Sequence, residues 1–240
     1  MSLRQNIRTS EPHSEERCAA LSGSDAAHAP QEFRAALDAL DALAAQVITR
    51  ALPIRLGEAR TPSEREAVYR LRYRVAVERG WIAPQDFPSG LEQDEDDDAA
   101  IQVAAWDGDT IIATSRLVLP RPGHLLPTER TFGLNFLARD RMVHVGRICA
   151  VPLRNRGRAH LFQAVLAQSW LEMRQRGFTE GCGTLTASML RLWRKPGLKV
   201  EILGPAKSFW GELRYPALVR PQDSVESLLG STKTVLASIC

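Results

Sequence analysis

Apolar residues recur along the chain with two periodicities, and together they predict helices and strands from residue 33 onward. The first element is an amphipathic helix over 33–52, since its large apolar residues fall on one helical face. Those residues are Phe33, Leu37, Leu40, Ala44 and Val47. Residues 1–32 hold few large apolar side chains and many Ser, Glu, Ala and Pro, so a disordered tail is expected there.

A second helix is predicted from Thr61 to about Gly80. Thr61 can cap this helix, Pro62 suits its first turn, and Glu64 can close a capping box. Its apolar stripe consists of Val68, Leu71 and Val75. A long loop is expected to follow, over 81–100.

The middle and the end of the chain are predicted to form strands with helices between them. Asp107-Gly108 stands between two β-rich runs, and this dipeptide favours a two-residue hairpin turn. The expected elements are strands 101–106, 110–119 and 142–151, helix 160–176, strand 184–186, helix 188–195, strands 200–203 and 209–218, and a C-terminal tail over 221–240. This order predicts a single α/β domain over 33–220, with one mixed, mostly antiparallel sheet flanked by helices.

The composition narrows the class of protein without indicating an activity. The 240 residues are 44% hydrophobic, and 31 basic against 28 acidic residues give a net charge of +3, too small to imply nucleic acid by itself. The four cysteines show no C-x-x-C pairing and no zinc-like spacing, so incidental reduced thiols are expected. No apolar run is long enough to span a membrane, and the polar N-terminus lacks a signal-peptide core, so a cytoplasmic location is expected.

The sharpest local motif is a basic loop between a predicted strand and a predicted long helix. It contains Arg154, Arg156, Gly157, Arg158 and Ala159. Backbone N–H groups at the start of a helix, together with the helix dipole and nearby arginines, favour phosphate binding. A plain strand–helix turn with solvated arginines is the alternative.

This loop resembles the pyrophosphate-binding loop of the GCN5-related N-acetyltransferase (GNAT) superfamily, because Arg154-x-x-Gly157-x-Ala159 follows the predicted fourth strand. The resemblance implies a GNAT-like fold. It also implies that the loop binds the phosphopantetheine of an acyl donor.

A second set of motifs resembles the acyl-homoserine-lactone synthases and the related long-chain N-acyl amino acid synthases. The matching segments are Leu71-Arg72-Tyr73-Arg74-Val75, Glu78-Arg79-Gly80-Trp81, Asp94-x-x-Asp97, Ser115-Arg116-Leu117 and Val145-Gly146-Arg147. The resemblance covers roughly 53–218 and implies an acyl-carrier-protein thioester as donor. His144 stands where the lactone synthases carry Glu, and Ala76 where they carry Phe, so the acceptor is expected to differ from S-adenosylmethionine.

The charged residues in these motifs also predict an ion pair from physical chemistry alone, without the family resemblance. Arg72 lies at the edge of the apolar stripe of its helix, and an arginine that leans toward the core needs a carboxylate, since an unpaired buried charge is costly. Asp94 and Asp97 follow in the next loop and can supply it. The alternative is that the whole acidic run is solvated. Solvation is the expectation for Glu95, Asp96 and Asp98.

His144 and Arg147 stand three apart on a predicted strand, which places them on opposite faces unless a bulge intervenes. Gly146 favours such a bulge. With it, His144 can serve as general base toward an acceptor amine. Arg147 can then hold the acceptor carboxylate or Asp97 in a bidentate contact. A paired histidine without catalytic duty and a structural arginine are the alternatives.

Three more residues complete the candidate site. Arg116 lies in an apolar strand and either reaches solvent or faces the acceptor cleft. Trp81 either forms a wall of that cleft or packs in the core. Cys149 lacks a suitably spaced histidine, and buried thiols are usually inert. We therefore expect only its backbone to contribute, as an oxyanion contact alongside Arg147.

The sequence thus predicts an acyltransferase that moves a fatty acyl group from an acyl-carrier-protein or acyl-CoA thioester to the primary amine of an amino acid-like acceptor. Two alternatives stay open: lactone synthesis from S-adenosylmethionine, and a non-catalytic acyl-carrier-binding relic of the fold. Acyl carrier protein is the expected partner, while a bound cofactor, a metal ion and nucleic acid are not expected. The residues expected to dock acyl carrier protein are Arg154, Arg156 and Arg158, with Arg174 and Arg176 at the end of the same helix.

Overall fold

The computed structural model describes residues 23–151 and 158–230, and the chain divides into two units, Met1–Ala35 and Ala36–Cys240. Helix α1 (Gly23–Arg50) begins ten residues before the predicted start of the first helix. Residues 23–32 are therefore helical where a tail was expected, and 1–22 lie outside the described residues. This stretch holds several alanines, which favour a helix without adding the large apolar side chains that periodicity detects.

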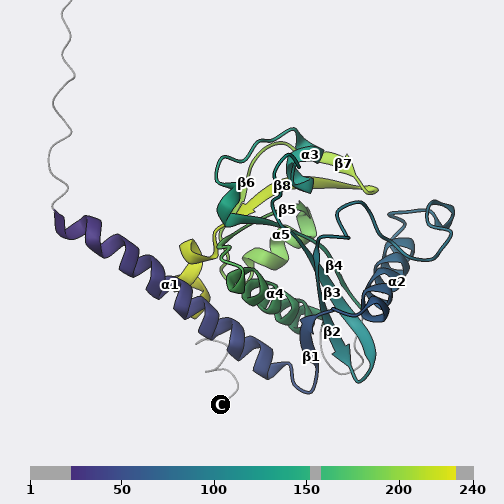
Figure 1. The fold of residues 1–240 in the computed structure, drawn as a ribbon, viewed down its shortest axis with the longest axis horizontal. Helices are drawn as coiled ribbons and strands as arrows, with labels where there is room; N and C mark the ends of the chain where they lie inside the picture. Colours follow the sequence, from purple (N-terminus) through teal and green to yellow (C-terminus); the bar gives the residue numbers. More distant parts are fainter. Residues whose placement is uncertain (1–22, 152–157, 231–240) are drawn as a thin grey trace, which may run out of the picture. The chain divides into compact units, whose positions relative to one another are not determined.

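The second unit is built on one mixed sheet (Figure 1), as the sequence predicts, although the sheet has eight strands where six were predicted. The strands are β1 (Arg55–Glu58), β2 (Ile101–Asp107), β3 (Thr110–Val118), β4 (Met142–Ala150), β5 (Glu180–Thr186), β6 (Val200–Ile202), β7 (Lys207–Phe209) and β8 (Glu212–Val219). Their order is β1-β2-β3-β4-β5-β8-β6, with β7 paired to β8. Only β4 and β5 pair in parallel; the other pairs are antiparallel.

Helices cover both faces of this sheet (Figure 1). Helix α2 (Pro62–Glu78) packs on one face, where Ala104 and Trp106 of β2 meet it. Helix α4 (Arg158–Gln175) packs on the other face, against Val103 and Ala105. The remaining helices are α3 (Pro127–Phe132), α5 (Ala187–Arg194) and the 3-10 turns Pro84–Asp86, Arg139–Arg141 and Pro221–Ser224.

Local sequence signals account for the elements that were predicted correctly. Thr61 Oγ1 accepts a hydrogen bond from the backbone N–H of Glu64 (3.2 Å), and Glu64 Oε2 accepts one from the N–H of Thr61 (3.1 Å), which completes the capping box. Gly108 adopts a φ of 58° in the β2–β3 turn, a conformation that glycine takes without strain. Both elements thus start or turn where the sequence pattern places them.

Three elements differ from the sequence prediction. Helix α3 lies in a stretch expected to be an irregular connection, and the last predicted strand is a hairpin, with Trp210 and Gly211 at its turn (φ 55° and 67°). Residues 221–230, expected to begin the tail, fold back, since the Lys199 N–H donates to Ser224 Oγ (2.8 Å) and Val225 packs on the core. Residues 231–240 lie outside the described residues.

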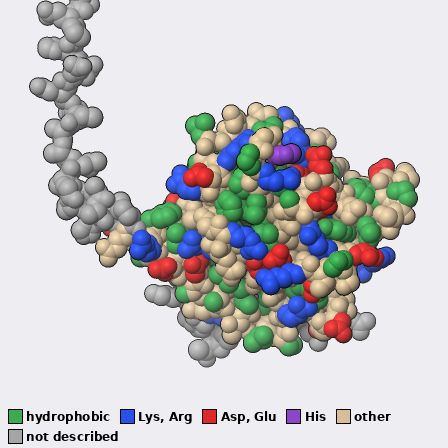
Figure 2. Space-filling view, in the orientation of Figure 1, with side chains coloured by type: hydrophobic (Ala, Val, Ile, Leu, Met, Phe, Trp, Pro, Cys, Tyr) green, Lys and Arg blue, Asp and Glu red, His purple; other side chains and the backbone are tan. Residues whose placement is uncertain are grey.

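None of the helices in the described ranges combines the length and the apolar character that crossing a membrane requires. On the face shown in Figure 2, basic and acidic side chains are interspersed with apolar ones, so this face carries no broad patch of one sign.

Candidate active site

Arg72 is buried beneath α2 and holds Asp97 in a bidentate ion pair. Its Nη1 and Nη2 donate to Asp97 Oδ1 and Oδ2 at 2.7 and 2.9 Å, and its Nε donates to Glu92 Oε2. Gln102 Nε2 adds a hydrogen bond to Asp97 Oδ1 (2.8 Å). The pairing of Arg72 with Asp97 that the sequence predicts is thus confirmed.

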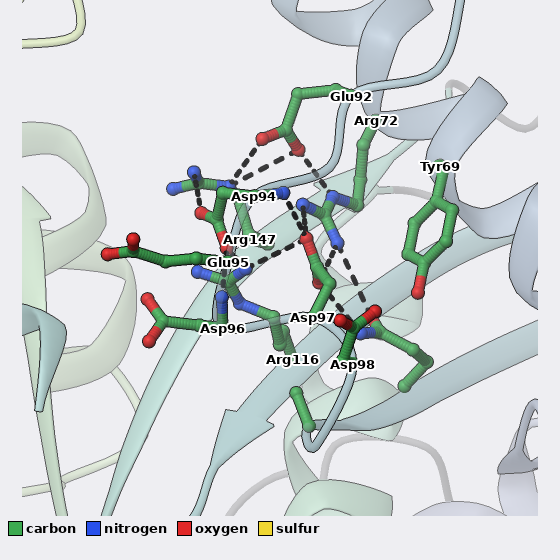
Figure 3. A network of polar contacts seen from close by, with 12 residues as sticks. Tyr69, Arg72, Glu92, Asp94, Glu95, Asp96, Asp97, Asp98, Arg116 and Arg147 are labelled. Atoms are coloured by element: carbon green, nitrogen blue, oxygen red, sulfur yellow. Dashed lines mark hydrogen bonds and ion pairs between the residues drawn. The ribbon is translucent and has the colours of Figure 1, made fainter. Parts of the chain in front are cut away.

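This pair is part of a closed ring of alternating charges, formed by three arginines and three carboxylates (Figure 3). We call it the charge ring. Its members, in order of contact, are Arg72, Asp97, Arg116, Asp94, Arg147, Glu92 and again Arg72. Each carboxylate bridges two guanidinium groups, and each guanidinium bridges two carboxylates. Four of the six charges are nearly fully buried, those of Arg72, Glu92, Asp97 and Arg116. Their burial is tolerated because every one has two partners of opposite sign.

Helix α2, the loop after it, and strands β3 and β4 each contribute to the charge ring. Arg116 Nη1 lies 3.0 Å from Asp97 Oδ2, and Arg147 Nη2 lies 2.8 Å from Asp94 Oδ2. Arg147 therefore contacts Asp94 and Glu92, whereas the sequence analysis expected it to hold Asp97 or the acceptor carboxylate. Arg116 faces the site, which decides between its two predicted orientations.

The charges of the ring shift the pKa values of its members. Burial alone would raise the pKa of Asp97, but the hydrogen bonds and charge of Arg72, with the charge of Arg116, outweigh it and hold that pKa well below its usual range. Asp94 also has a lowered pKa, because hydrogen bonding and charge from Arg116 and the charge of Arg147 outweigh desolvation. Both carboxylates are therefore ionised at neutral pH.

Glu92 and Asp96 correct the expectation that most of the acidic run is solvated. Glu92 was not singled out by the sequence, yet it is 1% exposed, because its N–H donates to the Tyr69 carbonyl (3.1 Å) and places the loop along α2. Asp96 is buried too, with Arg130 Nη2 2.6 Å from its Oδ2. Glu95 and Asp98 are exposed, as expected.

A bulge in β4 brings His144 and Arg147 to the same side of the sheet. Arg116 pairs with Gly146 and Thr114 with Cys149, so β4 takes three steps where β3 takes two. Arg147 has a φ of 51°, a left-handed conformation that is unusual for a residue with a side chain. The predicted bulge is confirmed, and both side chains line one cavity.

His144 is 3% exposed and forms a hydrogen bond with Thr128, whose Oγ1 lies 2.9 Å from its Nδ1. Burial and the charges of Arg116, Arg147 and Arg130 hold the pKa of His144 well below its ordinary value. The imidazole is therefore neutral at pH 7 and has a nitrogen lone pair available to accept a proton.

The cavity beside these residues has a volume of about 290 Å³. It is lined by Phe87, Glu92, Asp94, Asp96, Arg116, Pro127, Arg130, Thr131, His144, Arg147, Thr184, Phe209 and Trp210. Charged groups of both signs thus share the cavity with three aromatic side chains.

Trp210 forms a wall that the sequence analysis missed. The guanidinium Cζ of Arg147 lies 3.9 Å from the centroid of the Trp210 ring, a cation–π contact. Trp81 does not line the cavity; it packs behind Trp210, with the ring centroids 6.4 Å apart. A two-residue turn ending in Gly211 was the available signal for the hairpin that carries Trp210.

Cys149 points away from the chemistry. Its side chain is buried with Trp106 and Ile111 in the core under α2, and burial raises the pKa of the thiol to about 11. A thiol of that pKa is protonated at pH 7 and is a poor nucleophile. The expectation of an inert thiol is thus supported, and the backbone contact of Cys149 stays a prediction.

The predicted donor loop is only partly described. Arg154, Arg156 and Gly157 lie outside the described residues, and Arg158 and Ala159 begin α4, where their side chains are not described. Arg174 and Arg176 stand at the opposite end of this helix, about 24 Å from Arg158 at the rise of an α-helix.

Arg174 and Arg176 also have partners of their own. Arg174 pairs with Asp41 (3.3 Å), and Arg176 pairs with Glu172 (2.7 Å) and Glu58 (3.0 Å). The docking patch expected at both ends of α4 stays a prediction, with Arg174 and Arg176 already engaged in these ion pairs. Within the described residues, moreover, no group of three or more His, Cys, Asp or Glu side chains is placed to hold a metal ion.

Comparison with known proteins finds the same fold and a matching family model. The model of the N-acyl amino acid synthase FeeM family matches residues 67–195, more than half of the chain. The search of curated proteins finds no significant match.

Several solved structures are similar to this one. TofI in a ternary complex with an inhibitor and MTA is 24% identical, with a TM-score of 0.57 over 72% of this chain and 96% of that one. The AHL synthase LasI is 14% identical, with a TM-score of 0.59 over 72% and 93%. FeeM, an N-acyl amino acid synthase from uncultured soil microbes, is 15% identical, with a TM-score of 0.53 over 73% and 93%. At these identities the likenesses establish the shared fold.

Proposed function

Because the chain belongs to the N-acyl amino acid synthase FeeM family and is therefore an acyltransferase, we propose that it transfers a fatty acyl group from an acyl-carrier-protein thioester to the primary amine of an amino acid. Acyl-CoA is the alternative donor, and the cytoplasm is the proposed location. The observation that carries the proposal is the cavity, in which charges of both signs and aromatic side chains lie beside His144 and the β4 bulge.

The exposed charges of the cavity support an acceptor that carries both an ammonium and a carboxylate group. Asp94 and Arg130 have side chains that are 31% and 44% exposed, whereas Glu92, Asp96 and Arg116 are nearly fully buried. We assign the ammonium group to Asp94 and the carboxylate to Arg130. Arg72, Arg116 and Asp97 would then position Asp94 rather than touch the acceptor, and Trp81 would support the wall behind Trp210.

The donor is proposed to enter where β4 and β5 separate. These strands pair only over Met142–His144 and Glu180–Cys182, although β4 continues to Ala150 and β5 to Thr186. We place the thioester carbonyl in this gap, against backbone N–H groups of Arg147–Cys149 that would stabilise the oxyanion. The loop of Arg154, Arg156, Gly157, Arg158 and Ala159 remains the proposed site for the phosphopantetheine, and acyl carrier protein the proposed partner.

The reaction that we propose needs no covalent enzyme intermediate. The acceptor ammonium first gives one proton to solvent, and the resulting amine attacks the thioester carbon and forms the C–N bond. The nitrogen of the tetrahedral adduct loses a second proton to His144, and the C–S bond then breaks. The leaving thiolate takes up the proton from His144, which restores the neutral imidazole. A nitrogen that bears the adduct is more acidic than a free ammonium ion, so a base with a lowered pKa suffices.

Mass spectrometry of organic extracts tests the proposal. A bacterial host would express the wild-type chain, Arg147→Ala, or Arg191→Ala as the control, since Arg191 is exposed on α5, outside the cavity. We expect an N-acyl amino acid with the wild type and with Arg191→Ala but not with Arg147→Ala. Circular dichroism would verify that Arg147→Ala is folded. The absence of any N-acyl species, together with no turnover of acyl carrier protein thioesters in vitro, would overturn it.

The same extracts separate the proposal from lactone synthesis. An N-acyl homoserine lactone, with release of methylthioadenosine from S-adenosylmethionine, would establish the alternative acceptor. We favour the amino acid because His144 stands where the lactone synthases carry a glutamate; the ammonium and carboxylate groups themselves are common to both acceptors.

A further inference from the structure

Thr128 contacts the proposed base from α3, a helix that the sequence pattern does not predict. Its side chain is fully buried (0% exposed), and its Oγ1 lies 2.9 Å from His144 Nδ1. A neutral imidazole carries its proton on one of two nitrogens, and the partner of one nitrogen decides which form is present. Thr128 is therefore placed to choose the tautomer of His144.

We propose that Thr128 is a positioning residue for His144: its oxygen accepts a hydrogen bond from Nδ1–H, which leaves the lone pair of Nε2 for the acceptor nitrogen. The inference rests on the proposed function, because it takes His144 to be the group that receives the proton. It assigns a role to a residue that lies outside the charge ring and the donor loop.

The position of the His144 imidazole supports this arrangement. A Cβ atom built on Gly146 would lie 2.6 Å from His144 Nε2 and 3.3 Å from Cδ2, so the imidazole occupies the space that a side chain at this position would take. The Nε2 edge thus lies against the backbone of the bulge, two residues from His144 on β4. Thr128 holds the ring at the other nitrogen.

The surrounding charges favour the same tautomer. The charges of Arg116, Arg130 and Arg147 act on the imidazole, and all three guanidinium groups line the cavity that His144 lines. Positive charge is better met by a lone pair than by an N–H group, and Thr128 already faces Nδ1, so these charges are compatible with a lone pair at Nε2. The carboxylates that line the same cavity are those of Glu92, Asp94 and Asp96, each paired with an arginine.

Cys182 is the candidate acceptor for the hydroxyl proton of Thr128. Cys182 pairs with His144 across β4 and β5, and burial raises the pKa of its thiol to about 12, against a smaller opposing effect of the hydrogen bond with Thr128. If the hydroxyl donates to this sulfur, the oxygen of Thr128 keeps its lone pairs for Nδ1–H. The hydroxyl then has one donor and one acceptor contact, which satisfies a buried Thr.

The test combines nitrogen-15 NMR of His144 with kinetics of Thr128→Val, which keeps the shape and removes the hydroxyl, and Thr128→Ser, which keeps the hydroxyl. We expect the wild type and Thr128→Ser to show protonated Nδ1, and Thr128→Val to lose this preference. With palmitoyl thioester of acyl carrier protein and the amino acid that reacts best among the twenty, kcat of Thr128→Val should fall about tenfold or more, with KM within about twofold.

The two variants distinguish positioning from packing. If packing were the role of Thr128, Thr128→Ser would be at least as harmful as Thr128→Val, because only Ser leaves a cavity. Equal loss of kcat in both variants, or an unchanged tautomer in Thr128→Val, would overturn the inference while the proposed function stands. If the wild type acylates none of the amino acids, the proposed function fails, and the NMR comparison still decides whether Thr128 sets the tautomer.

Discussion

Both faces of the sheet bury apolar side chains, but the α2 face also buries a network of charged ones. On the α4 face, Val103 and Val165 are 0% exposed and belong to the main apolar cluster. On the α2 face, Arg72 and Arg116 are 1% exposed, yet both are charged. Apolar packing is non-directional, whereas each ion pair fixes the direction of two polar groups. The first face chiefly stabilises the fold, and the second also holds the proposed catalytic groups in position.

The most damaging way to break the comparison is to remove one charge from the ring. Arg72→Leu leaves Glu92 and Asp97 each without one of its two partners, and an uncompensated buried charge costs about 3–5 kcal/mol of unfolding free energy. Urea unfolding followed by tryptophan fluorescence measures this. The control is Arg70→Leu, an exposed position on α2 whose ion pair with Glu66 contributes less than about 1 kcal/mol. Equal effects would show that the ring is not a buried network.

An apolar truncation on the opposite face should cost stability without costing chemistry. Val165→Ala removes two methyl groups from the middle of α4 and should lower the free energy of unfolding by about 1–3 kcal/mol, from lost burial and the cavity left behind. We expect kcat per folded molecule to stay within about twofold. A tenfold loss of kcat in the folded variant would contradict the division of labour between the faces.

Acid should weaken the α2 face specifically. The pKa of Asp97 is lowered on folding, so its contribution to stability is present above the unfolded pKa of about 3.9 and is lost as the pH falls toward the folded value. This group accounts for at most about 1.4 kcal/mol per pH unit. Urea unfolding between pH 5 and pH 3 should therefore have a shallower pH slope in Asp97→Asn. The exposed Asp109→Asn should keep the wild-type slope; identical slopes in all three would refute the assignment.

The smallest effect is expected at Cys149, which belongs to the charged face by position but to the apolar class by packing. Cys149→Ala should leave kcat within about twofold, because the thiol is protonated and only the backbone is proposed to contact the oxyanion. Its unfolding free energy should fall by about 1 kcal/mol for the lost contacts. Steady-state kinetics decides this, since a tenfold drop in kcat would assign the sulfur to the reaction.

Local signals in the sequence predicted the elements whose causes are local. The capping residues Thr61 and Glu64 fixed the start of α2, and the Asp-Gly turn fixed the β2–β3 hairpin. Arg72 was predicted to need a carboxylate from its place on the helical stripe alone, and Asp97 supplies it. The bulge was predicted because His144 and Arg147 stand three apart on one strand, with Gly146, a residue that favours bulges, between them.

The unpredicted parts of the site depend on contacts between segments far apart in the chain. Glu92 is buried because its loop returns along α2, and no periodicity of the sequence marks it among six neighbouring acids. Trp210 reaches the cavity through a hairpin turn inside what reads as one strand. Thr128 lies in a six-residue helix, too short for an apolar period to register.

The closed form of the charge ring has a consequence for how such a protein can diverge. Each member forms ion pairs with two neighbours of opposite sign, so replacing one member by a neutral residue removes an ion pair from two partners at once. A descendant lineage can therefore leave this arrangement only by exchanging several positions together, while the apolar face accepts single substitutions of similar volume. Among related sequences, substitutions at the six ring positions should therefore occur together, whereas substitutions at the α4 face should occur one at a time.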